Sequence, residues 1–184
     1  MKLILVRHGQ TKENASRVVQ GQKFGTLSEL GKQQVKDVAK ELSRESFDII
    51  YSSDLERCVD TSNAILRFHK QTPFFLRTEV REFTFGVFEG KPSQSKLVHL
   101  GVVTGIMLPK RILGVESPRN VRERVVPFIN HVFQKHKDQT VLVVTHGGVI
   151  RILKSVIDGT SFQFSRKLEV PNCSVWRFDI QKEL

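Results

Sequence analysis

The sequence has few cysteines and no long apolar run. Only two of its 184 residues are cysteine, Cys58 and Cys173, and they lack the CxxC spacing of a metal or redox site. We expect both to be small, buried side chains without a disulfide. No apolar stretch approaches the roughly 18 residues needed to cross a membrane, and the first one is too short for a signal peptide. The sequence therefore predicts a cytoplasmic protein with no membrane partner.

Acidic residues are scarce relative to basic ones. The chain has 29 Lys and Arg against 19 Asp and Glu, which gives a formal net charge of +10. This charge favours anionic partners, either nucleic acid or phosphorylated small molecules. The basic residues are scattered and are not interleaved with aromatic residues, so we expect no nucleic-acid partner. A solvated basic surface without any partner remains an alternative.

The sequence also lacks an internal repeat, a low-complexity tract and a linker, so we expect one domain over residues 1–184. Short apolar runs alternate with helical patterns, which predicts an α/β protein. The expected architecture is a three-layer α/β/α sandwich whose mostly parallel central sheet has helices on both faces. Strands are predicted at residues 2–6, 47–53, 73–80, 140–145 and 173–180.

Helix starts are marked by capping residues. Ser28, Asp54 and Ser117 each precede a helical pattern as a predicted N-cap. Pro127 lies inside the third of these helices and is expected to kink it. A nearly all-apolar helix is predicted at 149–157, after two glycines. The segment 83–115 lacks regular periodicity, and we expect it to be a short lid or insertion.

Three of the predicted strands are followed by residues whose side chains could take part in catalysis or ligand binding. Ligands of open α/β sheets bind at the carboxyl ends of the strands, so these residues are expected to meet at one site. They are Arg7 and His8 after the first strand, Arg57 after the second, and His146 after the strand 140–145. The site would then combine two imidazoles with two guanidinium groups.

This combination is typical of a phosphoryl-binding pocket. Arginine forms bidentate pairs with phosphate oxygens, and the helix that begins near Gly147 would add free N–H groups. A metal site is the rival interpretation of paired histidines. The sequence has no HExxH motif or suitably spaced acidic ligands, and the arginines would repel a cation. We therefore expect no metal and no cofactor, and a neutral histidine could serve as the nucleophile.

Five ordered sequence blocks resemble the histidine phosphatase superfamily, which is also called phosphoglycerate mutase-like. The first contains the RHG triplet of that family, and the others match its later motifs in order. The blocks are RHGQTKEN (7–14), LSELGKQQ (27–34), SSDLERCVDT (52–61), REFTFGVFEG (81–90) and VTHGGVIR (144–151). A lone RHG would be weak evidence, whereas five blocks in order are strong evidence.

The resemblance implies a role for each matching residue. His8 would be the nucleophile that becomes phosphohistidine, and Glu82 would donate a proton to the leaving group. The phosphoryl oxygens would be bound by Arg7, Asn14, Arg57, His146 and Gly147. Glu79 and Glu89 lie close to Glu82 in the sequence and remain alternative proton donors.

The resemblance also implies an activity. The expected function is a metal-independent phosphomonoesterase that acts on a phosphorylated small molecule. The segment 91–115 is short compared with true phosphoglycerate mutases, and a short lid favours a phosphatase because a mutase must keep its intermediate away from water. A phosphoglycerate mutase, or a non-catalytic anion or nucleic-acid binder on the same fold, remains an alternative.

Several other residues are expected either to have no part in the chemistry or to select the substrate. We expect His69, His99, His131 and His136 to be exposed, and Arg124 and Arg151 to be surface or helix-face cations. Candidates for substrate selection are Arg17, Lys91, Lys96, Lys110 and Arg111. A homodimer through the edge strand 173–180 is a further possibility.

Overall fold

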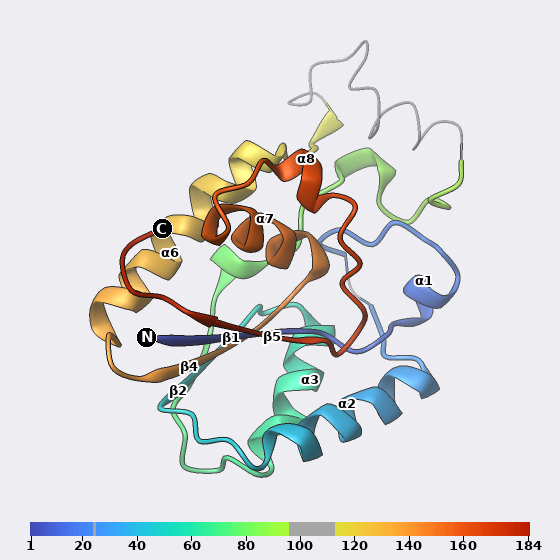
Figure 1. The fold of residues 1–184 in the computed structure, drawn as a ribbon. Helices are drawn as coiled ribbons and strands as arrows, with labels where there is room; N and C mark the ends of the chain where they lie inside the picture. Colours follow the sequence, from blue (N-terminus) through green and yellow to red (C-terminus); the bar gives the residue numbers. More distant parts are fainter. Residues whose placement is uncertain (24, 96–112) are drawn as a thin grey trace.

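The computed structural model describes residues 1–23, 25–95 and 113–184. At its centre lies a five-stranded sheet with the order β3-β2-β4-β1-β5 (Figure 1). The strands are β1 (Lys2–Arg7), β2 (Ile49–Ser52), β3 (Phe74–Leu76), β4 (Thr140–Thr145) and β5 (Val175–Asp179). Neighbouring strands are parallel, except that β5 runs antiparallel to β1. This mostly parallel sheet confirms the predicted fold class.

Both faces of the sheet are buried. Along β1, Leu3 and Leu5 contribute to one apolar core, while Ile4 and Val6 contribute to the other. Helices α6 (Pro118–Lys135) and α7 (Gly147–Ile157) cover the first face, and α2 (Glu29–Leu42) and α3 (Glu56–Leu66) cover the second (Figure 1). Because β1, β2 and β4 are covered on both sides, their sequences are mainly continuous apolar runs instead of alternating ones.

Two of the predicted helix caps are confirmed. The Oγ of Ser28 accepts a hydrogen bond from the N–H of Gly31, and the Oγ of Ser117 accepts one from the N–H of Asn120. Helix α6 continues through Pro127. The shorter helices are α1 (Lys12–Ala15), α8 (Phe162–Ser165) and the 3₁₀ turns η1 (Thr78–Val80) and η2 (Gly86–Phe88).

The predicted cap at Asp54 is wrong. The N-cap position of α3 is occupied by Leu55, which makes no side-chain capping bond. The carboxylate of Asp54 forms a two-pronged ion pair with Arg81 instead. A charge-assisted pair with arginine is stronger than a bond to a single backbone N–H, so it takes the carboxylate away from the helix.

The third strand is shorter than predicted. β3 ends at Leu76, which pairs with Ser52, the last residue of β2. The N–H of Arg77 still donates to the carbonyl oxygen of Ser52, and the chain then turns into η1. Of the expected lid, the structure describes η2 and the bridge between Phe85 and Val115. Residues 96–112 lie outside the described residues, and so do the predictions made for Lys96, His99, Lys110 and Arg111. None of the helices in the described ranges is long and apolar enough to cross a membrane.

Candidate active site

The carboxyl ends of β1 and β4 bring the two predicted histidines together. These strands are parallel neighbours in which Arg7 pairs with Thr145, and the N–H of His8 donates to the carbonyl oxygen of Thr145. The ring centroids of His8 and His146 are 5.1 Å apart. The strand register therefore places His8 and His146 side by side, as the sequence predicts.

His8 is held as a neutral imidazole, and its Nε2 has no hydrogen-bond partner in the part of the chain that the structure describes. Its Nδ1 lies 2.8 Å from the carbonyl oxygen of Gly9, which can only accept, so Nδ1 carries the proton. Burial, together with the nearby charges of Arg57 and Arg7, lowers the pKa of His8 well below 6.5. The lone pair of Nε2 is therefore available at neutral pH, as a nucleophile requires.

His146 is neutral for similar reasons, but both of its nitrogens have protein partners. Burial, followed by Arg57, lowers its pKa well below 6.5. The Nε of Arg57 donates to Nδ1 over 3.3 Å, so Nε2 carries the proton and lies 2.9 Å from the Oγ of Ser53. A direct bond from His146 to a phosphoryl oxygen would have to replace one of these contacts. Ser53 is a site residue that the sequence analysis did not single out, although it lies in a matching block.

Arg57 is almost entirely buried and Arg7 is half-buried, and within the described ranges both donate only to neutral groups. Arg57 is 1% exposed and donates to the carbonyl oxygens of Gly21 and Lys23. Arg7 donates through Nη1 to the carbonyl oxygen of Val170, while its buried Nε has no hydrogen-bond partner among the described residues. Burial lowers the pKa of both guanidinium groups.

Neither arginine forms an ion pair with a carboxylate in the described ranges. Buried charges are normally paired, because taking an ion out of water costs several kcal/mol in a real protein, as an order of magnitude. The buried Arg57, the half-buried Arg7 and the buried Nε–H group of Arg7, which lacks a partner among the described residues, therefore form a site that fits an anion.

The N-terminus of α7 adds backbone donors beside Arg7. A methyl group placed on Gly147 would lie 3.5 Å from the Nε of Arg7 and 3.4 Å from the Nη1 of Arg151. Gly147 therefore lies beside the orphaned donor, at the positive end of the helix dipole. This placement agrees with its predicted part in anion binding.

Glu82 also lies at the N-terminus of α7. Its Oε2 accepts a hydrogen bond from the N–H of Gly148 over 3.1 Å, and its Oε1 accepts one from the N–H of Phe83 over 2.9 Å. Glu89, a neighbouring candidate acid, has a different role. The Oε1 of Glu89 accepts hydrogen bonds from Gln22, Thr84 and Phe85, and therefore has a structural role. Of the three candidate acids, Glu82 is the one whose carboxylate lies at the N-terminus of α7.

Asn14 is connected to the site indirectly. Its Oδ1 accepts a hydrogen bond from the N–H of Thr11 and lies 3.4 Å from the Nδ2 of Asn172, which donates to the carbonyl oxygen of His8. The segment 168–173 was not predicted to take part. It contacts the site mainly through backbone groups, which leave no side-chain signal, but Asn172 follows a proline in a turn-like Pro-Asn pair.

Several background assignments need correction. His69 is 8% exposed and its Nε2 lies 3.1 Å from the carbonyl oxygen of Leu42, whereas His136 is half-buried against the hydroxyl of Tyr51.

Arg124 is no surface cation, because its side chain is only 20% exposed and it forms an ion pair with Glu116. His131 is exposed and Cys58 is buried, as predicted. Both cysteines are free, but Cys173 is half-buried, so the prediction that it is buried is wrong.

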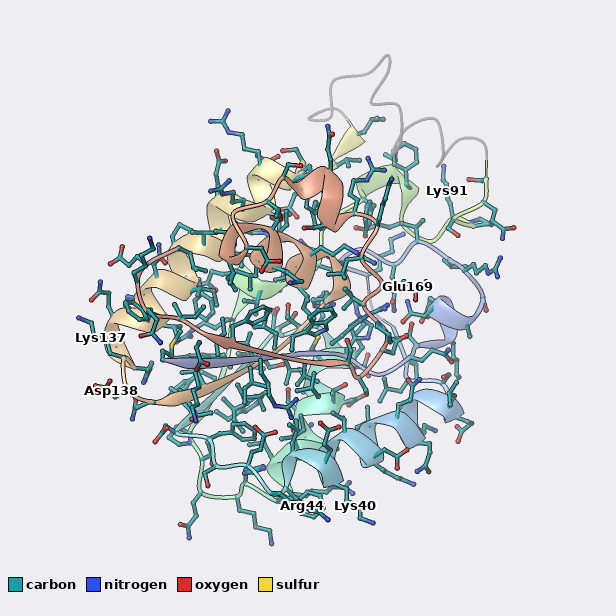
Figure 2. All side chains as sticks on the ribbon, viewed as in Figure 1. Lys40, Arg44, Lys91, Lys137, Asp138 and Glu169 are labelled. Carbon is teal, nitrogen blue, oxygen red and sulfur yellow. The ribbon has the colours of Figure 1, made fainter. Side chains whose placement is uncertain are left out.

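The site lies at one end of the molecule. Figure 2 shows Lys91 and Glu169 near the end toward which β1 and β4 run, and Lys137 and Asp138 at the opposite end. Lys91 is half-buried at the site end, which is compatible with its predicted part in substrate selection.

The fold and the site define an α/β protein in which two arginines lie beside two neutral histidines at the carboxyl ends of the strands. The chain belongs to the histidine phosphatase superfamily (branch 1), whose family model matches residues 3–184. The resemblance drawn from the five sequence blocks is therefore confirmed. The chemical roles assigned to individual residues stay predictions.

Named relatives include phosphatases and mutases. The chain is 30% identical over 161 residues to the metal-independent phosphoserine phosphatase of Arabidopsis thaliana, covering 83% of this chain and 66% of that protein. Its fold is similar to that of a mycobacterial glucosyl-3-phosphoglycerate phosphatase, with a TM-score of 0.80, 26% identity, and coverage of 96% and 91%. It is also similar to a phosphoglycerate mutase from Bacillus anthracis, with a TM-score of 0.81, 26% identity, and coverage of 96% and 86%.

Proposed function

We propose that the protein is a metal-independent phosphomonoesterase that hydrolyses a phosphorylated small molecule through a phosphohistidine on His8. The observation that carries the proposal is the pairing of a neutral His8 with Arg7 and Arg57; within residues 1–23, 25–95 and 113–184, the Nε2 of His8 has no hydrogen-bond partner and neither arginine forms an ion pair with a carboxylate. An anion with two negative charges, such as a phosphoryl group, would compensate both cations at once.

In the first step, Nε2 of His8 attacks phosphorus and the bond from phosphorus to the ester oxygen breaks. The leaving oxygen takes a proton from the carboxyl group of Glu82 and departs as an alcohol. Arg7 and Arg57 offset the charge on the phosphoryl oxygens, and the N–H groups at the start of α7 assist them. The proton on Nδ1 of His8 stays hydrogen-bonded to the carbonyl group of Gly9, which orients the ring.

In the second step, water attacks the phosphohistidine and the bond from phosphorus to Nε2 breaks. The carboxylate of Glu82 takes a proton from this water, which restores its acid form for the next turnover. His8 then leaves as a neutral imidazole, and its lowered pKa favours this departure. The products are inorganic phosphate and an alcohol, and no metal ion takes part.

Hydrolysis of 4-nitrophenyl phosphate in excess EDTA tests this proposal. We expect turnover by the wild type that survives EDTA and is lost in His8→Ala. The matched control is His131→Ala, because His131 is an exposed histidine on α6. Activity that disappears with EDTA, or that His8→Ala retains, would contradict the proposal.

A phosphoglycerate mutase is the second candidate, because the mutase from Bacillus anthracis has a similar fold. Interconversion of 3- and 2-phosphoglycerate in the presence of bisphosphoglycerate would support it. For the phosphatase, the names of the relatives suggest phosphoserine, 3-phosphoglycerate and glucosyl-3-phosphoglycerate as first substrates to test. Salt-sensitive binding of nucleic acid without turnover of any phosphate ester would favour the non-catalytic binder.

A further inference from the structure

We propose that Arg124 is a positioning residue that aims Glu82 by fixing the main chain on either side of it, a role that rests on the proposed function. Arg124 lies on α6, and its charge is one of those that lower the pKa of His146. Its Nη1 donates to the carbonyl oxygen of Glu79 over 2.6 Å, and its Nη2 donates to the carbonyl oxygen of Glu82 over 3.0 Å. One guanidinium group thus spans the turn that presents the carboxylate.

Glu82 needs such support because it lies on a segment without regular secondary structure, between η1 and η2. A catalytic group must be held within about 0.5 Å of its working position, which a free loop does not provide. Backbone hydrogen bonds of a helix or strand would normally supply this stiffness. Here the segment gains it from side chains of other elements.

The neighbouring residues of the segment are fixed in the same way. The Oγ1 of Thr145 donates to the carbonyl oxygen of Val80, and Arg81 is paired with Asp54. The Nε2 of Gln22 donates to the carbonyl oxygen of Glu82 over 3.0 Å. Arg124 differs from these contacts because it alone, among the described residues, bridges two carbonyl groups three positions apart.

Glu116 completes the arrangement. Its Oε1 accepts a hydrogen bond from the Nε of Arg124, and its Oε2 accepts from Nη2 over 3.0 Å, a two-pronged geometry that fixes the guanidinium plane. The same Oε2 accepts from the N–H of Thr84, and the N–H of Glu116 donates to the carbonyl oxygen of Thr84. Arg124 and Glu116 together hold the main chain from residue 79 to residue 84.

A leaving-group series tests this role. In Arg124→Gln, we expect the loss of kcat/KM for an alkyl phosphate to exceed the loss for 4-nitrophenyl phosphate by at least about tenfold, because only the poor leaving group needs the proton of Glu82. Arg119→Gln is the control, since Arg119 is an exposed residue of the same helix with a carboxylate partner, and it should change neither rate.

A double-mutant cycle separates positioning from general loss of structure. If Arg124 acts through Glu82, Arg124→Gln should cost little in a Glu82→Gln background. Equal losses with both leaving groups, or fully additive losses in the cycle, would overturn the proposal. If Arg124→Gln does not fold, Arg124→Lys and Glu116→Gln provide the same comparison. Absence of His8-dependent hydrolysis in the wild type would instead contradict the proposed function itself.

Discussion

At the scale of single residues, the site depends on charges that the folded chain leaves uncompensated. The guanidinium group of Arg57 is buried and Arg7 is half-buried next to two histidines that stay neutral, so the site has an excess of positive charge. The carboxylate of Glu82 lies across the helix terminus and forms no ion pair with them in the described ranges. The charge of Glu82 raises the pKa of both arginines but compensates them only in part, so an anion from outside the chain would be stabilised there.

Replacing Glu82 with glutamine should expose its role as a proton donor. For an alkyl phosphate we expect kcat/KM to fall by about 10²–10⁴-fold, and for 4-nitrophenyl phosphate by much less, since nitrophenolate leaves without a proton. Steady-state kinetics over a series of leaving groups measures this. Glu79→Gln is the control, because the structure places the side chain of Glu79 beside Thr78, outside the site. A loss that is independent of the leaving group would argue against proton donation by Glu82.

At the scale of elements, the strands were predictable and the loops between them were not. The apolar runs in β1 and β4 fix where these strands end, so the meeting of His8 and His146 followed from the sequence. The true length of β3 did not follow from the sequence, because the strand ends where its partner β2 ends. The site residues that follow directly after strands can therefore be predicted better than those on the loops between the strands.

Contacts to backbone groups explain most of what the sequence analysis missed. Arg124 and Gln22 bind the main chain of Glu82, and Val170 binds Arg7 through its carbonyl oxygen. Such partners can be any residue type, so no motif marks them. The prediction that Asp54 caps α3 was wrong because the sequence does not distinguish an aspartate that caps a helix from one that forms an ion pair.

The start of α7 gives a prediction at the element scale. A methyl group on Gly148 would lie 2.2 Å from the Oε1 of Glu82 and 2.6 Å from the ring of Phe83, so Gly148→Ala must displace the carboxylate. We expect this variant to lose activity in the same leaving-group-dependent way as Glu82→Gln, which kinetics on alkyl and aryl phosphates would check. Wild-type selectivity in a folded Gly148→Ala protein would show that Glu82 does not need this close approach.

At the scale of the whole molecule, the buried histidines link stability to pH. In the unfolded chain, histidine titrates near pH 6.5, whereas burial holds the pKa values of His8 and His146 well below this in the folded state. Below about pH 6.5 the unfolded chain thus binds more protons. The free energy of unfolding should therefore decrease as the pH falls, by about 1 kcal/mol per pH unit for each histidine.

Denaturant unfolding of the protein without bound phosphate, between pH 5 and pH 7.5, measures this slope. In His8→Asn the slope should become shallower, because one of the two groups is gone. His131→Asn, which removes an exposed histidine, should keep the wild-type slope. If His8→Asn retains the full pH dependence, His8 is not held neutral by the fold.

The central claim is that His8 carries the phosphoryl group during turnover, and trapping the phosphoenzyme tests it most directly. The enzyme would be mixed with substrate in EDTA, quenched in base within the first turnover, and digested for mass spectrometry under conditions that preserve phosphohistidine. We predict phosphate on the peptide that contains His8, and none in His8→Asn. Turnover by the wild type with phosphate on another residue, or on none, would contradict the mechanism.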